Sequence, residues 1–254
     1  MTNTAAEHYD RLLAEHYTWM LGGDIPSLAA DQERLLRDLG VRPGPAGTLA
    51  VDLGCGPGPQ SLALAGLGFD RVLAVDTSRA LLDELAARAA GTAAAGVVHP
   101  VHGDIRHILP EHVGPSGAAA VVCMGDTLTH LPDKEDVTSL LDDIARSLAP
   151  GGLLVIGYRD LTAPLTGTDR FIPVRATADR VMTCFLEYTD EDTVTVHDLV
   201  HTRSGDTWTL RTGCYPKLRI DPSWLAGQCR AAGLDVRHDA PGPRGTRIVT
   251  AAKP

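Results

Sequence analysis

The chain has 254 residues, of which 44% are hydrophobic and 22% charged, a composition that supports a globular fold with a full apolar core. Its formal net charge of −9 disfavours a nucleic-acid partner, because such partners are bound through clustered lysines and arginines. No apolar run approaches the roughly 18 residues of a membrane-spanning helix. The first ten residues, MTNTAAEHYD, have neither the basic start nor the apolar core of a signal peptide, so we expect a cytoplasmic protein that does not contact membranes. Five scattered cysteines without a CxxC pair indicate reduced thiols rather than disulfides or a zinc site, and we expect no bound metal.

The N-terminal 47 residues are predicted to be helical. Apolar side chains recur at helical spacing over residues 9–21 and again over residues 31–39. Gly40 and the PGPAG stretch at residues 43–47 end this segment. We therefore interpret residues 1–47 as a helical unit that precedes the main fold.

From Thr48 onward, short apolar runs alternate with amphipathic helices. A helix is expected after Ser78 and another after Asp133, the second ending at residues 150–152, and both cap residues are of the preferred type. This alternation predicts an α/β fold, a doubly wound parallel sheet with helices on both faces, over residues 48–170. The expected strands are residues 49–53, 71–75, 97–102, 118–123 and 153–158.

The pattern changes to antiparallel β structure after Phe171. Three segments, residues 180–188, 193–202 and 207–215, place β-branched residues on alternate positions and are joined by turn-forming residues. They predict a three-stranded meander, an antiparallel β insert over residues 171–220. Residues 221–254 then add a last helix and two strands, 234–238 and 247–251, which complete the main fold.

The stretch VDLGCGPGPQS at residues 51–61 places glycines at positions 54, 56 and 58, after the first strand. Such a loop lets a ligand approach the backbone and leaves N–H groups free at the start of a helix. It lies at the carboxyl end of a strand, where ligands bind in open α/β sheets. A dinucleotide fingerprint would need a glycine where Pro59 stands, and the charge of Asp52 opposes a pyrophosphate. The loop therefore favours a cationic ligand without phosphate.

Four motifs in order resemble those of the class I S-adenosylmethionine-dependent methyltransferases. They are VDLGCGPG at residues 51–58, AVDTS at 74–78, GDI at 103–105 and VVCMGDTLTHL at 121–131. The resemblance implies S-adenosylmethionine as cofactor and a Rossmann-like sheet of seven strands that ends in a reversed β-hairpin. It also implies that the N-terminal helices form a lid over the cofactor.

The resemblance assigns roles to individual residues. Asp52 would steer the ammonium group of the cofactor, Asp76 would accept both ribose hydroxyls, and Asp104 would accept from the adenine amino group. On their own, Asp76 could equally be a helix cap and Asp104 a turn residue. The cofactor-binding residues expected in this way are Tyr17, Asp52, Gly54, Cys55, Gly56, Gly58, Asp76, Thr77, Asp104, Ile105, Met124 and Gly125.

Several side chains are candidates for the methyl acceptor's site. His130 follows the fourth motif and is the first candidate for a general base, although a histidine here could instead bond to backbone. His16 and Trp19 belong to the expected lid, while His197 and His201 share one face of an inserted strand. Aromatic residues of the insert are further candidates for pocket walls: Phe185, Tyr188, Trp208 and Tyr215. The insert could cover the acceptor, pair two subunits in a homodimer, or only stabilise the fold.

The sequence thus predicts methyl transfer from S-adenosylmethionine to a nitrogen or oxygen atom of a small metabolite. The composition, rich in Ala, Gly and Arg, together with the resemblance to small-molecule methyltransferases, favours a bacterial enzyme of natural-product biosynthesis. Two alternatives stay open. A nicotinamide-dependent oxidoreductase would share the glycine loop and Asp76, and a non-catalytic protein would bind S-adenosylmethionine without turnover.

Overall fold

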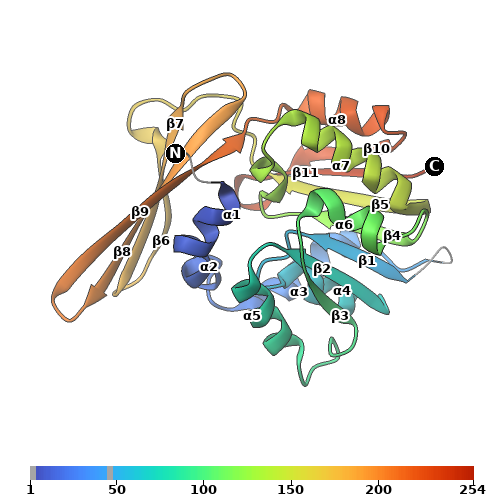
Figure 1. Cartoon of the computed structure of the whole chain (residues 1–254), viewed down its shortest axis with the longest axis horizontal. Helices are drawn as coiled ribbons and strands as arrows, with labels where there is room; N and C mark the ends of the chain where they lie inside the picture. The colour runs from blue at the N-terminus through green and yellow to red at the C-terminus, as the bar shows by residue number, and fades with distance from the viewer. Residues whose placement is uncertain (1–3, 45–47) are drawn as a thin grey trace.

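The computed structural model describes residues 4–44 and 48–254, and residues 45–47 of the PGPAG stretch lie outside it. It shows a large α/β unit with a second, smaller sheet beside it (Figure 1). Of the helices in these residues, none is long and apolar enough to cross a membrane.

Seven strands form the main sheet, in the order β10-β11-β5-β4-β1-β2-β3. The first five strands in the chain run parallel, whereas β11 pairs antiparallel with both β5 and β10. The predicted Rossmann-like sheet with a reversed C-terminal hairpin is therefore confirmed. The strands are β1 (Leu49–Leu53), β2 (Arg71–Asp76), β3 (Val98–His102), β4 (Ala118–Cys123), β5 (Leu148–Tyr158), β10 (Asp235–Pro241) and β11 (Arg247–Ala252).

Helices cover both faces of this sheet, as a doubly wound fold requires. One apolar cluster joins the sheet to α6, α7 and α8, and a second joins it to α3, α4 and α5. Asp133 and Asp221 cap α7 and α8 through their side chains. The helices are α3 (Ile25–Asp38), α4 (Pro59–Gly66), α5 (Arg79–Ala89), α6 (Ile105–His112), α7 (Lys134–Ser147) and α8 (Pro222–Ala231).

The N-terminal helices lie between the main sheet and the insert (Figure 1). They form a nearly continuous helix made of α1 (Ala5–His8), a π-helical turn (Tyr9–Leu13) and α2 (Ala14–Met20). Leu12 and Leu13 are buried against the inner face of the insert. The insert is an antiparallel sheet of four strands in the order β6 (Phe171–Ala176), β7 (Arg180–Tyr188), β8 (Thr193–Ser204) and β9 (Thr207–Leu218).

Four details of the fold differ from the sequence prediction. The insert has a fourth strand, β6, which was not predicted. It contains Pro173, and its pairing with β7 shifts register after that residue. Helix α6 was not predicted, because Pro110 lies inside it. Helix α7 ends at Ser147, so residues 148–152 belong to β5 and not to the end of the helix. Ser78 stands at the start of α5, but its side chain makes no capping hydrogen bond.

Candidate functional site

Two adjoining cavities open beside the carboxyl ends of β1, β2 and β4. The larger has a volume of about 710 Å³ and the smaller about 240 Å³. Both are lined by Tyr9 and Tyr17 of the N-terminal helices and by Gly54, Gly56 and Gly125 of the main fold. The two cavities therefore meet between the glycine loop and the loop that follows β4.

The glycine loop borders both cavities through Gly54 and Gly56, which carry no side chains. Gly56 has a φ of +53°, and its N–H donates a hydrogen bond of 2.8 Å to Asp76. A Cβ at this position would lie 3.3 Å from the ring of Tyr17. Gly58 serves a different purpose, since a Cβ there would lie only 2.1 Å from Leu85 of α5. Gly58 thus allows the loop to pack on α5, and it lines neither cavity.

Asp76, at the end of β2, is one of two acidic residues in the wall of the smaller cavity. One carboxylate oxygen accepts from the N–H of Gly56 and the other from the N–H of Ser78, each at 2.8 Å. A carboxylate offers about four acceptor positions, so these bonds do not use all of them. Burial raises the pKa of Asp76 above its ordinary value, although backbone hydrogen bonds from Ser78, Gly56 and Thr77 oppose the rise. The group is suited to accept from two neighbouring hydroxyls.

The rest of the smaller cavity combines apolar walls with an acid. Leu81, Ile105 and Leu131 line it together with Thr77 and Asp104. Asp104 caps α6 and takes hydrogen bonds from the side chain of Arg106, which lower its pKa despite partial burial. The pairing of Asp104 with Arg106 was not expected from the sequence. The cavity can hold a flat ring between apolar side chains with a diol at Asp76.

The larger cavity lies between the glycine loop, the N-terminal helices and the inner face of the insert. Cys55, Met124 and Gly125 form its floor, and apolar side chains of the insert form its wall. Those wall residues are Ile172, Val174, Leu186 and Val196. Such a chamber, closed on one side by apolar strands, can enclose a small organic molecule.

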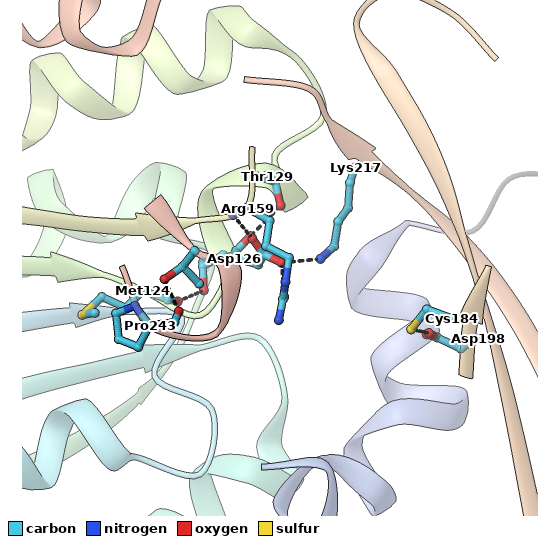
Figure 2. A network of polar contacts seen from close by, with 10 residues as sticks. Met124, Asp126, Thr129, Arg159, Cys184, Asp198, Lys217 and Pro243 are labelled. Carbon is cyan, nitrogen blue, oxygen red and sulfur yellow. Dashed lines mark hydrogen bonds and ion pairs between the residues drawn. The ribbon is translucent and has the colours of Figure 1, made fainter. Parts of the chain in front are cut away.

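A buried carboxylate, Asp126, stands at the centre of the polar residues in this chamber (Figure 2). It accepts hydrogen bonds from the backbone N–H of Arg159 at 2.6 Å and from its guanidinium at 2.7 Å. The ammonium of Lys217 in β9 donates a third, at 2.9 Å. These two cations hold the pKa of Asp126 well below its usual range, although burial alone would raise it.

A second polar group in the chamber belongs to the insert and α1. Asp198 of β8 is buried, hydrogen-bonds His8 at 2.7 Å and accepts from the thiol of Cys184 at 2.9 Å. The His8 ring stacks on Tyr215 with 4.7 Å between centroids. Burial raises the pKa of Cys184, so its thiol is not an activated nucleophile.

Aromatic rings gather where the two cavities meet. Tyr9 lies between Tyr17 and His130, with ring centroids 5.5 and 5.6 Å away, and Tyr215 lies 5.6 Å from His130. Nε2 of His130 is buried and has no hydrogen-bond partner among the described residues. Burial, with a smaller contribution from Lys217, lowers the pKa of His130 to about 3. His130 is therefore neutral at physiological pH and offers a nitrogen that can accept a hydrogen bond.

The structure brings together most of the residues expected at the cofactor. Asp52 and Gly58 are exceptions. Asp52 is 1% exposed, its carboxylate accepts from Ser61 at 2.6 Å, and it lines neither cavity. The other residues expected at the cofactor each line one or both cavities: Tyr17, Gly54, Cys55, Gly56, Asp76, Thr77, Asp104, Ile105, Met124 and Gly125.

Apart from His130, the histidines and the tryptophan expected at the acceptor line neither cavity. His197 and His201 alternate with buried residues of β8, so they lie on the outer face of the insert, where His197 pairs with Glu187. Trp19 packs beside the guanidinium groups of Arg175 and Arg180. His16 is buried against Arg180. Of the insert's aromatic residues, Tyr215 lines the larger cavity, whereas Phe185, Tyr188 and Trp208 line neither.

Sequence reasoning missed Tyr9, Asp126, Arg159, Asp198 and Lys217. Asp126 lies three residues after the end of β4 and Arg159 directly after β5, so the rule that ligands bind at the carboxyl ends of parallel strands could have found them. The residues of the N-terminal helix and the insert carry no such signal, because their positions depend on how these elements pack.

Residues 50–152 match a family described as a methyltransferase domain. Among solved structures, the CcbJ methyltransferase from Streptomyces caelestis is 20% identical, with 100% of this chain and 98% of that chain covered and a TM-score of 0.74. CalS10, an amino pentose methyltransferase from Micromonospora echinaspora involved in calicheamicin biosynthesis, is 18% identical over 94% and 96% of the two chains, with a TM-score of 0.69. The sugar N-methyltransferase KedS8 from Streptoalloteichus is 17% identical over 100% and 94%, with a TM-score of 0.62. At these identities the structures establish the fold. A search of curated proteins finds no match.

Proposed function

We propose that this chain, whose residues 50–152 match a methyltransferase domain, transfers a methyl group from S-adenosylmethionine to a nitrogen or oxygen atom of a small metabolite. The observation that carries the proposal is the junction of the two cavities. A slot that fits a nucleoside, with Asp76 placed for a diol, opens beside the glycine loop into a chamber that fits an acceptor.

The described residues fit S-adenosylmethionine part by part. Ile105 and Leu131 would hold the adenine, Asp76 the ribose hydroxyls, and the backbone of Gly54 and Gly56 the amino-acid arm. Asp52 is left out of the direct contacts, because its carboxylate is buried under Ser61. When bound, S-adenosylmethionine supplies a methyl group already activated on a sulfonium sulfur.

The side chains of the protein then align the two reactants and shield them from water. Tyr9 and Tyr17 close the junction from the N-terminal helix, and electron-rich ring faces attract a sulfonium or an ammonium. The insert covers the chamber and excludes water, so the two reactants are held in line for displacement. His130 lines the smaller cavity and packs against Tyr215 of the chamber, so its Nε2, in the tautomer that leaves it unprotonated, would accept a hydrogen bond from the acceptor's N–H or O–H where the cavities meet. With a pKa of about 3, His130 is a weak base, so positioning is its main contribution.

We propose an amino sugar or similar amine as the acceptor, in natural-product biosynthesis. The names of two similar structures, an amino pentose methyltransferase and a sugar N-methyltransferase, support this class. A bacterial origin and a cytoplasmic location belong to the same proposal. So does a homodimer through the outer face of the insert, where Phe171, Trp208 and Leu210 are exposed.

The test is methyl transfer to a panel of free and glycosidically linked amino sugars, each paired with the analogue that carries a hydroxyl in place of the amine. The proposal predicts formation of S-adenosylhomocysteine and of a methylated product with at least one amine. Turnover with hydroxyl analogues alone would assign oxygen as the methylated atom. Tight cofactor binding without turnover on any member would favour the non-catalytic alternative.

A further inference from the structure

The loop after β4 is held in place from two directions. Residues 124–130, called here the transfer loop, carry Gly125 between the two cavities and end at His130. Within the loop, the carbonyl of Asp126 accepts hydrogen bonds from the backbone and the hydroxyl of Thr129. The carboxylate of Asp126 points the other way, to Arg159 and Lys217 (Figure 2).

Asp126 adopts a conformation that an aspartate does not favour. Its φ is +79°, in the left-handed region, and a residue other than glycine keeps this conformation only where its surroundings hold it there. Its carboxylate is 2% exposed, so an unpaired charge at this place would be strongly unfavourable. The shape of the transfer loop therefore depends on the cations that pair with Asp126.

The two cations come from different parts of the molecule. Arg159 directly follows β5 of the main sheet, so its position is fixed by the core. Lys217 lies near the end of β9, and its side chain is only 10% exposed. The pair between Lys217 and Asp126 thus joins the insert, which forms the wall of the acceptor chamber, to the loop that borders the cofactor cavity.

The same lysine also lies beside the candidate orienting group. Around His130 are gathered Lys217 and Tyr215 of β9, Asp126 of its own loop, and His8 and Tyr9 of the N-terminal helix. The Lys217 ammonium lies 5.9 Å from the ring centroid of Tyr215, whose edge meets His130. A shift of β9 would therefore act on the transfer loop at two points, Asp126 and His130.

We infer that the Lys217–Asp126 ion pair lets the insert set the position of the transfer loop, which makes Lys217 a positioning residue for methyl transfer. The inference rests on the proposed function. It means that an acceptor seated against the insert and a cofactor seated against Gly125 influence each other through this pair. Neither Lys217 nor Asp126 needs to touch a reacting atom.

The experiment measures the affinity for S-adenosylhomocysteine by calorimetry, together with thermal unfolding, in Lys217→Met, Asp126→Asn, the double variant and Lys217→Arg. The matched control is Arg211→Met, which removes another β9 cation that pairs with Glu15 of the N-terminal helix instead of the transfer loop. If Lys217→Met does not fold, Lys217→Gln takes its place, because it keeps a donor at the same position.

We expect Lys217→Met and Asp126→Asn each to weaken S-adenosylhomocysteine binding about tenfold at temperatures where both are fully folded. The double variant should lose no more than Asp126→Asn alone, Lys217→Arg should restore most of the affinity, and Arg211→Met should stay within about twofold. Lower unfolding temperatures with unchanged affinity in all variants would overturn the inference, because the pair would then only stabilise the fold. A wild-type protein that does not bind S-adenosylhomocysteine would instead refute the proposed function.

Discussion

The buried carboxylate of Asp52 should make the protein less stable as the pH rises. Burial raises the pKa of Asp52 from 3.8 to about 7, in spite of the hydrogen bond from Ser61. The folded protein therefore keeps this proton up to neutral pH, whereas the unfolded chain loses it near pH 4. Between these two values the folded state binds more protons, so stability falls as the pH rises through this window and levels off above pH 7.

The size of the effect follows from the shift of the pKa. A difference of one pH unit between the folded and unfolded pKa corresponds to about 1.4 kcal/mol. Ionisation of Asp52 should therefore lower the free energy of unfolding by about 3 kcal/mol between pH 5 and pH 9. For a protein of this length, that is a fall of roughly 5–10 °C in the unfolding temperature. Asp52→Asn removes the ionisation while keeping an oxygen that can accept from Ser61, and it should remove this part of the pH dependence.

The assay compares thermal unfolding of the wild type, Asp52→Asn and the control Asp38→Asn, an exposed aspartate of α3, from pH 5 to pH 9. The unfolding temperature of Asp52→Asn should rise relative to that of the wild type up to about pH 7, and the difference should then stay constant. Asp38→Asn should show the same pH dependence as the wild type. Because Asp52 lines neither cavity, affinity for S-adenosylhomocysteine should change less than about threefold. A stability difference that is the same at pH 5 and pH 8 would refute the reasoning.

Three further predictions concern the loop, the candidate orienting group and the outer face of the insert. Gly58→Ala should lower the free energy of unfolding by about 2 kcal/mol in urea titrations, because its Cβ would meet Leu85 at 2.1 Å. Gly91→Ala, where φ is also positive, at +74°, and nothing lies within 4 Å, should lose about 1 kcal/mol, and equal losses would count against the clash. His130→Asn should slow methyl transfer roughly 100-fold beyond any loss of S-adenosylhomocysteine affinity, because His130 also lines the smaller cavity, while His201→Asn on the outer face changes neither. A similar loss in both variants would contradict the assignment. Leu210→Glu, which places a charge on the half-exposed outer face, should convert a dimer to a monomer in light scattering; a wild-type monomer would disprove the homodimer.

The main fold could be predicted from the sequence because its signals are local. The strand β1 and the loop at Gly54, Gly56 and Gly58 follow from an apolar run and from backbone conformations that only glycine adopts easily. Asp133 and Asp221 mark the starts of α7 and α8 by a short-range hydrogen bond to the backbone. The position of Asp76 follows from the end of β2, and it lines the smaller cavity as expected.

The acceptor side could not be predicted in the same way, because it is made by packing between distant segments. Asp198 reaches the larger cavity only because β8 turns that face toward the N-terminal helix, which puts His197 and His201 outside. In the sequence Asp52 directly precedes the glycine loop, which suggested a role at the cofactor. In the structure its carboxylate instead accepts a hydrogen bond from Ser61. Alternation fixes which residues share a face of a strand, and it does not say which face is covered.

The measurement that tests the central claim most directly is calorimetric titration with S-adenosylhomocysteine and, in parallel, with NAD⁺, on the wild type and on Asp76→Ala. We predict saturable binding of S-adenosylhomocysteine alone, weakened about 100-fold in the variant, because two hydrogen bonds to a charged group are lost. Binding of NAD⁺ instead would favour an oxidoreductase. Unchanged affinity for S-adenosylhomocysteine in Asp76→Ala would contradict the assignment of the smaller cavity as the nucleoside site.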